Sequence, residues 1–224
     1  VARMAAVRQA VGPAVGVGLD FHGRVKVPTC KRLMAALAPY DPLFFEEPVS
    51  AEQNRSLPAM AAATSIPLAT GERMFTVAAF RDLLEARCVD ILQPDCSHCG
   101  GISPLLTIAR MAEAYDVSLA PHCPLGPIAL AACLAVDATA INFAFQETSV
   151  GIHYNGEDGE PVELLDYLAD RTVFDVDTDG YMALPRGPGL GVSIDEAKVR
   201  AMAIKGHTWR DREWVLPDGC PTTW

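Results

Sequence analysis

Six nearly continuous apolar segments recur along residues 1–147, and polar residues do not alternate with the apolar ones inside them. They are Val15–His22, Pro42–Glu47, Ile66–Glu72, Val89–Asp95, Val117–His122 and Ile141–Glu147. Apolar runs of this length are typical of parallel strands that helices cover. The pattern therefore predicts six strands of a parallel sheet.

Helix-like stretches lie between these segments. They are Pro28–Tyr40, Val77–Arg87 and Ser103–Tyr115. In the last stretch, Leu105, Ile108, Ala109 and Ala112 are spaced as they would be on one face of a helix. Strands that alternate with helices indicate the α/β class.

Each predicted strand finishes in an ionisable residue. These residues are Asp20, Glu46, Glu72, Asp95, His122 and Glu147, at intervals of 23 to 27 positions. Such a period fits one strand plus one helix. A doubly wound open sheet would not need a functional group at every strand end, whereas a (β/α) TIM-type barrel carries its active site at the carboxyl ends of its strands. We therefore predict a (β/α) barrel.

The predicted barrel is incomplete. Residues 1–147 supply six units, where a closed barrel of this kind has eight strands. The chain also opens on Val1 inside helix-like sequence, so we expect the first barrel strands to be missing. After Glu147 the repeat stops, and residues 148–224 are expected to form a loop, hairpin and tail segment that includes the polar loop NGEDGEP at 155–161.

Composition narrows the function classes. The chain has 224 residues, of which 50% are hydrophobic, and its formal net charge of −10 comes without any Lys/Arg block. Binding to nucleic acid or to an anionic membrane is therefore not expected. The longest apolar segment, Gly126–Val136, is shorter than the roughly 20 residues that span a bilayer. Seven cysteines without a dense framework indicate reduced thiols and a cytoplasmic protein.

Three consecutive strand ends carry carboxylates, namely Asp20, Glu46 and Glu72. No basic residue is expected between them, so on a barrel rim the three would repel one another unless a cation lay between them. Oxygen-only ligands favour a hard ion, and Mg²⁺ is the expected one. The alternative is that these are unrelated surface acids of an acidic protein.

The next two strands end in Asp95 and His122, which would be neighbours. A carboxylate that holds one imidazole nitrogen fixes the tautomer and leaves the other nitrogen as a general base. His22 follows Asp20 by two, and strand alternation would place both on one face, opposite His122. One imidazole on each side of a metal-bound substrate predicts a β-elimination of water, in which the cation stabilises the charge that develops beside a carboxylate.

An ordered series of motifs carries a family resemblance that covers nearly the whole chain. The motifs are LDFHGRV, FFEEPV, PLATGER, VDILQPDCSHCGGI, APHCPLGPIALA, QETSVGIHYN, LLDY and GPGLGV. Together they resemble the mandelate racemase branch of the enolase superfamily, and within it the D-galactonate dehydratases. In that family an N-terminal capping domain closes over the barrel mouth, and it has no counterpart before Val1.

The resemblance implies a role for each strand end. The metal ligands would be Asp20, Glu46 and Glu72; the base would be His122 with Asp95 as its partner, the acid His22, and the substrate contact Glu147. It also implies Mg²⁺-dependent conversion of D-galactonate to 2-dehydro-3-deoxy-D-galactonate and water, in galactose catabolism. A homo-oligomer is expected as well.

Alternatives to a D-galactonate dehydratase stay open at this point. The chain could be a dehydratase of a related aldonate, or an inactive fragment of such an enzyme. A more distant alternative is a zinc or redox protein, because Cys96 and Cys99 form a CxxC motif where small residues would be expected. No second matched pair completes a tetrahedral site, and packing of both thiols would make this departure unimportant.

Overall fold

The computed structural model describes residues 1–150, 165–204, 214–215, 219 and 221–222. Its main sheet has five parallel strands in the order β1-β2-β3-β4-β5. They are β1 (Leu19–Asp20), β2 (Phe45–Glu46), β3 (Leu68–Thr70), β4 (Ile91–Leu92) and β5 (Ser118–Leu119). A parallel bridge from Leu119 to Phe143 adds the sixth predicted segment. The predicted parallel arrangement is confirmed.

The ladders are shorter than the apolar segments that predicted them. Proline, which has no backbone N–H, stands at several of their limits. Pro67 directly precedes β3, Pro94 lies two residues beyond β4, and Pro121 two residues beyond β5. The lengths of the apolar segments therefore overestimated the lengths of the strands, because apolar residues indicate burial and not hydrogen-bonded pairing with a neighbouring strand.

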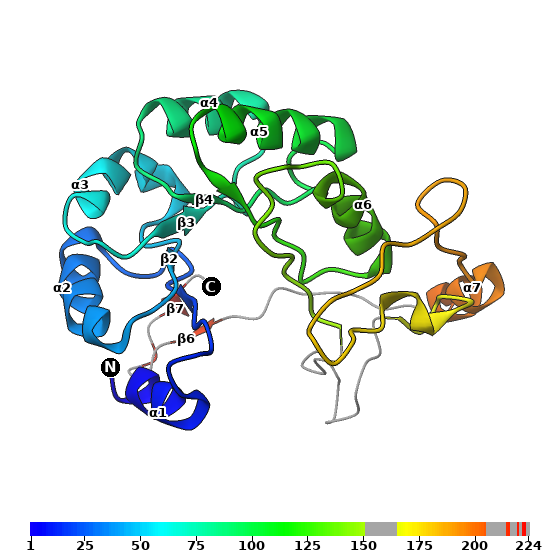
Figure 1. Cartoon of the computed structure of the whole chain (residues 1–224), viewed down its shortest axis with the longest axis horizontal. Coiled ribbons are helices and arrows are strands. Elements are labelled where there is room, and N and C mark those ends of the chain that lie inside the picture. Colours follow the sequence, from blue (N-terminus) through cyan, green and yellow to red (C-terminus); the bar gives the residue numbers. More distant parts are fainter. Residues whose placement is uncertain (151–164, 205–213, 216–218, 220, 223–224) are drawn as a thin grey trace.

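Helices lie before, between and after the strands of the sheet. They are α1 (Ala2–Val11), α2 (Val27–Leu37), α3 (Leu57–Ala61), α4 (Val77–Glu85), α5 (Ile102–Ala114), α6 (Pro127–Asp137) and α7 (Glu196–Ile204). Short 3₁₀ helices span Ala38–Tyr40, Ala51–Ser56 and Arg171–Phe174, and an antiparallel pair joins β6 (Trp214–Val215) to β7 (Pro221–Thr222). The three predicted helices correspond to α2 with the 3₁₀ turn after it, α4 and α5. Figure 1 shows α2 to α6 as an arc outside the strands.

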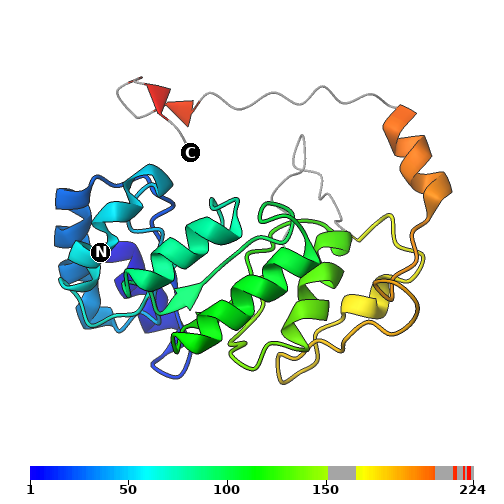
Figure 2. The ribbon, with the colours of Figure 1, turned by 90° about the horizontal axis from the view of Figure 1, so that it is seen from above.

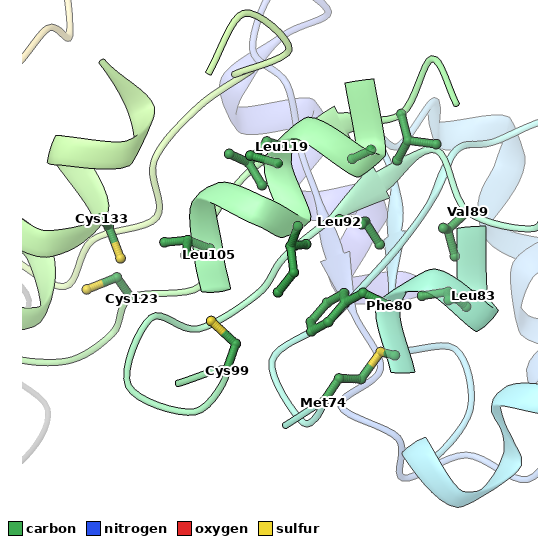
Figure 3. Close-up of a cluster of buried hydrophobic side chains, with 14 of the residues drawn as sticks. Met74, Phe80, Leu83, Val89, Leu92, Cys99, Leu105, Leu119, Cys123 and Cys133 are labelled. Atoms are coloured by element: carbon green, nitrogen blue, oxygen red, sulfur yellow. The ribbon is translucent and has the colours of Figure 1, made fainter. Parts of the chain in front are cut away.

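The main core lies between these helices and the sheet. Phe80 of α4, Leu105 of α5 and the strand residues Leu92 and Leu119 are fully buried there. Figure 2 shows α4, α5 and α6 packed side by side, and α5 contacts both neighbours. The close-up in Figure 3 places cysteine sulfurs in the same core. Burial of this face holds the helices against the sheet.

A smaller cluster lies on the opposite face of the sheet. Its members come from successive strand segments: Phe44, Ala69, Ile91 and Ala120, with Phe145 packed against them. The rings of Phe44 and Phe145 stack, with centroids 5.7 Å apart and planes 12° from parallel. The second segment therefore meets the sixth across the inner face, which is the curvature of a partial (β/α) barrel.

Two sequence expectations are not tested by this architecture. The division into 1–147 and 148–224 stays a prediction, and the polar loop at 155–161 lies outside the described residues. In the part of the chain that the structure describes, no helix is long and apolar enough to cross a membrane.

Candidate active site

The carboxyl ends of the strands bring the predicted residues to one edge of the sheet. Asp20 and Glu46 are direct partners in the β1–β2 ladder, and a parallel bridge pairs Asp95 with His122. Because parallel partners project to the same side, the two acids share one face and the dyad shares another part of the same rim. The ring of strand ends predicted from the sequence is therefore a spatial cluster.

Asp20 and His22 form a local turn at the end of β1. Asp20 Oδ1 accepts the His22 backbone N–H at 2.5 Å, and Oδ2 lies 2.9 Å from His22 Nδ1. His22 has a φ of 53°, so the strand has already ended and side-chain alternation does not apply. The prediction that the two side chains lie together is right, but its reason is wrong: an Asp-centred turn brings them together.

Glu46 lies among other acids. Burial, then the charge of Asp20, and also the charges of Glu147 and Glu72 raise the pKa of Glu46 to about 7, while a hydrogen bond from Gln93 opposes them. Burial is the largest cause of this rise, and the neighbouring carboxylates add to it, so Glu46 lies in a buried and acidic environment.

Glu72 lies between two imidazoles. Its Oε1 is 3.7 Å from His22 Nδ1, and its Oε2 is 3.5 Å from His122 Nε2. Arg73 Nε is 3.5 Å from Glu72 and 3.4 Å from Glu47. The expectation that no basic group is interleaved among the acids is therefore wrong, because Arg73 directly follows Glu72 and turns back onto it.

Gly71 fixes the turn that presents Glu72. A Cβ atom at this position would lie 2.6 Å from the carbonyl carbon of Gln93 and 2.8 Å from its oxygen. These contacts are to backbone on the neighbouring strand segment, so neither partner can move aside without disturbing the sheet. The glycine of the GER motif is thus required by close approach.

The dyad is preformed. His122 Nδ1 lies 2.7 Å from Asp95 Oδ2, and the Asp95 side chain is 1% exposed. Burial opposes ionisation of Asp95, but the His122 hydrogen bond, the charge of His98 and the Ser97 N–H outweigh it and lower the Asp95 pKa. Burial likewise opposes charge on His122, yet the Asp95 hydrogen bond and the charges of Glu147 and Glu72 raise the His122 pKa to about 9.

Glu147 faces the dyad from the sixth segment. Its Oε2 accepts the backbone N–H of Cys123 at 3.1 Å, which holds the carboxylate beside His122. Burial raises the Glu147 pKa, and the charge of His122 works against that rise. All seven residues predicted for the site thus lie at this rim.

One compact donor group occurs among the described residues, and its membership differs from the predicted ligand set. Ligand atoms of Asp20, His22 and Glu47 all lie within 4.8 Å of one another. Glu47, however, is already an ion-pair partner of Arg73, and His22 Nδ1 contacts Asp20. A hard cation is better served by carboxylate oxygens than by an imidazole nitrogen. Asp20, Glu46 and Glu72 offer oxygen donors only, and in this respect they suit such an ion, although Arg73 lies beside Glu72 as well as beside Glu47.

Sequence reasoning missed several residues of the rim. Glu47 is 2% exposed with a φ of 38°, and burial followed by the charge of Glu72 raises its pKa to about 8. Gln93 is 4% exposed and hydrogen-bonds Glu46. The EEP, GER and QPD motifs contain Glu47, Arg73 and Gln93, so the available signal was their position within two residues of a predicted site residue. Positive φ in a non-glycine residue is a further mark of functional sites.

The CxxC hypothesis gains no support. Cys96 and Cys99 are free thiols, 5% and 3% exposed, so both are packed. Burial raises the Cys99 pKa to about 11, which opposes formation of the thiolate that metal binding or redox exchange needs. Cys96 is hydrogen-bonded to Cys133 of α6. These thiols belong to the core.

Family membership follows from a match over most of the chain. Residues 1–198 match the family described as Enolase C-terminal domain-like. The chain belongs to this family. It is 54% identical over 224 residues to a D-galactonate dehydratase of Ralstonia nicotianae and 53% identical over 221 residues to one of Klebsiella pneumoniae, covering 100% and 99% of this chain.

Solved structures share the fold. A crystal structure of an enolase from Agrobacterium radiobacter with bound Na and L-malate superimposes with a TM-score of 0.82 at 35% identity, over 97% of this chain and 56% of that one. A mandelate racemase/muconate lactonizing enzyme-like protein from Rubrobacter xylanophilus gives 0.77 at 33%, over 89% and 48%. The chain spans 57% of the length of the Ralstonia relative and 56% of the Klebsiella one.

Proposed function

We propose that this chain carries the catalytic residues of a Mg²⁺-dependent sugar-acid dehydratase. The substrate would be D-galactonate, and the products 2-dehydro-3-deoxy-D-galactonate and water. The observation that carries the proposal is the buried Asp95–His122 pair, 2.7 Å apart, with His122 Nε2 directed to the acidic cluster at Glu72. The D-galactonate dehydratases among its relatives support the choice of substrate.

Asp20, Glu46 and Glu72 would hold the ion. When bound, Mg²⁺ supplies a Lewis acid that makes the proton next to the substrate carboxylate removable. The chain itself brings together carboxylates that repel one another. A bound cation would relieve this repulsion, so its binding is favourable. The raised pKa of Glu46, about 7, supports this assignment through its causes, burial and the charge of Asp20.

His122 would remove the proton from carbon 2. Its Nδ1–H donates to Asp95, so Nε2 is the nitrogen that accepts the proton. The Asp95 contact holds the ring in place and stabilises the imidazolium that forms. Neutralisation of Glu72 and Glu147, whose charges raise the His122 pKa, would bring that pKa from about 9 toward neutral pH, where a general base works best.

His22 would protonate the departing 3-hydroxyl group. It contacts the opposite oxygen of Glu72 from the one that His122 contacts, which supports placing one imidazole on each side of the bound substrate. Asp20 holds its Nδ1 and leaves Nε2 for the leaving group. Glu147, held by the Cys123 N–H, would accept a hydrogen bond from substrate.

The decisive test is turnover by the purified chain. With Mg²⁺ and D-galactonate, we expect a 2-oxo acid to form, detected as its semicarbazone; a chelator should stop the reaction and added Mg²⁺ should restore it. A panel of hexonates that differ at single carbons should show D-galactonate as the preferred substrate. Preference for an epimer would indicate a related aldonate dehydratase, and no turnover of any hexonate would favour an inactive fragment. Light scattering on the same sample tests the expected homo-oligomer.

A further inference from the structure

His98 lies at the rim, outside the set of residues assigned above. It belongs to the loop after β4, three positions beyond Asp95, and its side chain is 41% exposed. The loop is anchored because Asp95 Oδ1 accepts the backbone N–H groups of Ser97 at 2.6 Å and His98 at 3.3 Å. The imidazole is therefore presented from a fixed backbone.

The tautomer of His98 follows from its partner. Nδ1 lies 2.8 Å from the backbone oxygen of Glu72, and a carbonyl oxygen can only accept, so Nδ1 carries the hydrogen. The neutral ring then has an unprotonated Nε2 that accepts. The two ring nitrogens point away from each other, and no hydrogen bond to Nε2 occurs in the portion of the chain that the structure describes.

The ring lies between the proposed base and an exposed aromatic side chain. Its centroid is 6.3 Å from that of His122 and 5.8 Å from that of Phe75, which is 64% exposed. A short polyhydroxy chain whose carbon 2 contacts His122 can extend past His98. His98 is not the partner of Asp95 and so does not take the place of His122 as the proposed base. Asp95 Oδ2 is 3.9 Å from His98 Nδ1 but 2.7 Å from His122 Nδ1.

We propose that His98 is a substrate-binding residue, whose Nε2 accepts a hydrogen bond from a hydroxyl group on the chain of the sugar acid beyond carbon 3. The proposal rests on the proposed function for its ligand class. It gives the Glu72 carbonyl a role too: this backbone oxygen holds the ring in the tautomer that accepts. A sugar acid with a hydroxyl in reach would bind more tightly than its deoxy counterpart.

Two amide substitutions separate this role from a merely structural one. Asn at position 98 places its NH₂ near the site of Nδ1, so it keeps the bond to Glu72 and loses the acceptor at Nε2. Gln reaches the Nε2 position and loses the Nδ1 donor. If His98 binds substrate, His98→Asn is the damaging change; if it only ties two loops together, His98→Gln is.

Calorimetry measures the difference without turnover. D-galactonate is titrated with Mg²⁺ into the full chain in a His122→Asn background, which lacks the proposed base. We expect His98→Asn to weaken binding by roughly ten-fold, the size of one hydrogen bond, and His98→Gln to weaken it less. Deoxygalactonates that each lack one hydroxyl should identify the hydroxyl that donates to His98. The analogue that lacks this hydroxyl should bind with equal affinity to the chain with His98 and to the His98→Asn variant. Matching thermal unfolding midpoints verify that the variants are folded.

Each outcome decides the proposal. Unchanged affinity in His98→Asn, or a larger loss in His98→Gln, overturns it. If D-galactonate binds with the predicted His98 dependence but the unsubstituted chain forms no product, the dehydratase proposal fails and the role of His98 stands. If the chain turns D-galactonate over and His98→Asn binds normally, only the role of His98 fails. Absence of any sugar-acid binding refutes both.

Discussion

The rim has two halves, which differ in how their carboxylates are stabilised. In the dyad half, formed by Asp95, His122 and Glu147, Asp95 has His122 and backbone N–H groups as partners, and Glu147 has the Cys123 N–H. In the acidic half, formed by Asp20, Glu46 and Glu72, Asp20 and Glu46 are ladder partners of like charge. The Asp95 pKa is lowered, chiefly by the His122 hydrogen bond working against burial, whereas burial and Asp20 raise that of Glu46 to about 7.

This difference teaches what each half requires before it can act. The dyad half is complete in the chain itself, because each carboxylate has donors and the ring orientation is fixed. The acidic half gathers several carboxylates around the single cation Arg73 beside Glu72, so a bound cation would stabilise it, as proposed above. Substitutions in the two halves should therefore have opposite effects on the cation-free protein.

The largest expected effect is in the dyad half. His122→Asn removes the proposed base and should lower turnover of D-galactonate by about 10²–10⁴-fold. Mg²⁺ affinity should stay nearly unchanged, since the three proposed ligands remain. Steady-state rates and Mg²⁺ titration calorimetry check the two parts. Appreciable turnover by the variant would mean that another group is the base.

Glu46→Gln tests the acidic half. It removes one of the repelling charges, so the cation-free chain should become more stable, while Mg²⁺ binding should weaken by at least about ten-fold. Thermal unfolding with and without Mg²⁺ measures both effects. Asp95→Asn is the matched variant in the other half, and it should destabilise the cation-free chain by about 1–3 kcal/mol because His122 loses its charged partner. Destabilisation by both substitutions would remove the contrast between the halves.

Gly71→Ala tests the geometry that joins the halves. The new Cβ would meet the Gln93 backbone at 2.6 Å and displace the turn that carries Glu72, the residue that contacts both imidazoles. We expect a loss of about 1–3 kcal/mol in the free energy of unfolding, together with weaker Mg²⁺ binding. Gly16→Ala is the control, because its nearest neighbour is the flexible, exposed side chain of Leu43. Equal effects of the two would refute the close-approach argument.

The positions of the site residues that stand at strand ends could be predicted from the sequence. Regular spacing located Asp20, Glu46 and Glu72 on one rim, because parallel strands that share a sheet end at one edge. The same regularity predicted the Asp95–His122 contact, which the structure contains as a parallel bridge. Periodicity alone was sufficient for these placements.

Residues beyond a strand end could not be placed in this way. His22 and Glu47 adopt left-handed φ values of 53° and 38°, which no alternation rule anticipates. Arg73 and His98 lie in turns, and the side chain of each bonds the backbone oxygen of a residue beyond another strand end, His22 and Glu72 respectively. Strand limits were also missed, because the apolar segments extend beyond the residues that pair in the ladders. Local pattern predicts which segments are buried, but tertiary contacts decide where turns point.

The smallest expected effect separates burial from crowding as causes of a raised pKa. Asp137, at the end of α6, is 7% exposed with no hydrogen bond to either carboxylate oxygen among the described residues, and burial alone raises its pKa to about 8. The folded state therefore retains a proton that the unfolded chain loses near pH 4, so the contribution of Asp137 to stability should fall between about pH 4 and pH 8 and then level off. Asp137→Asn should raise the free energy of unfolding by about 1–3 kcal/mol at pH 8 and change it little at pH 4. Chemical denaturation at both pH values checks this, with the exposed Asp179→Asn as control.

Mg²⁺ should not change the effect of Asp137→Asn on stability, whereas it should change the effect of Glu46→Gln. The reason is that no acidic group contributes to the raised pKa of Asp137. If Mg²⁺ changed the effect of Asp137→Asn, burial would not be the sole cause of that raised pKa.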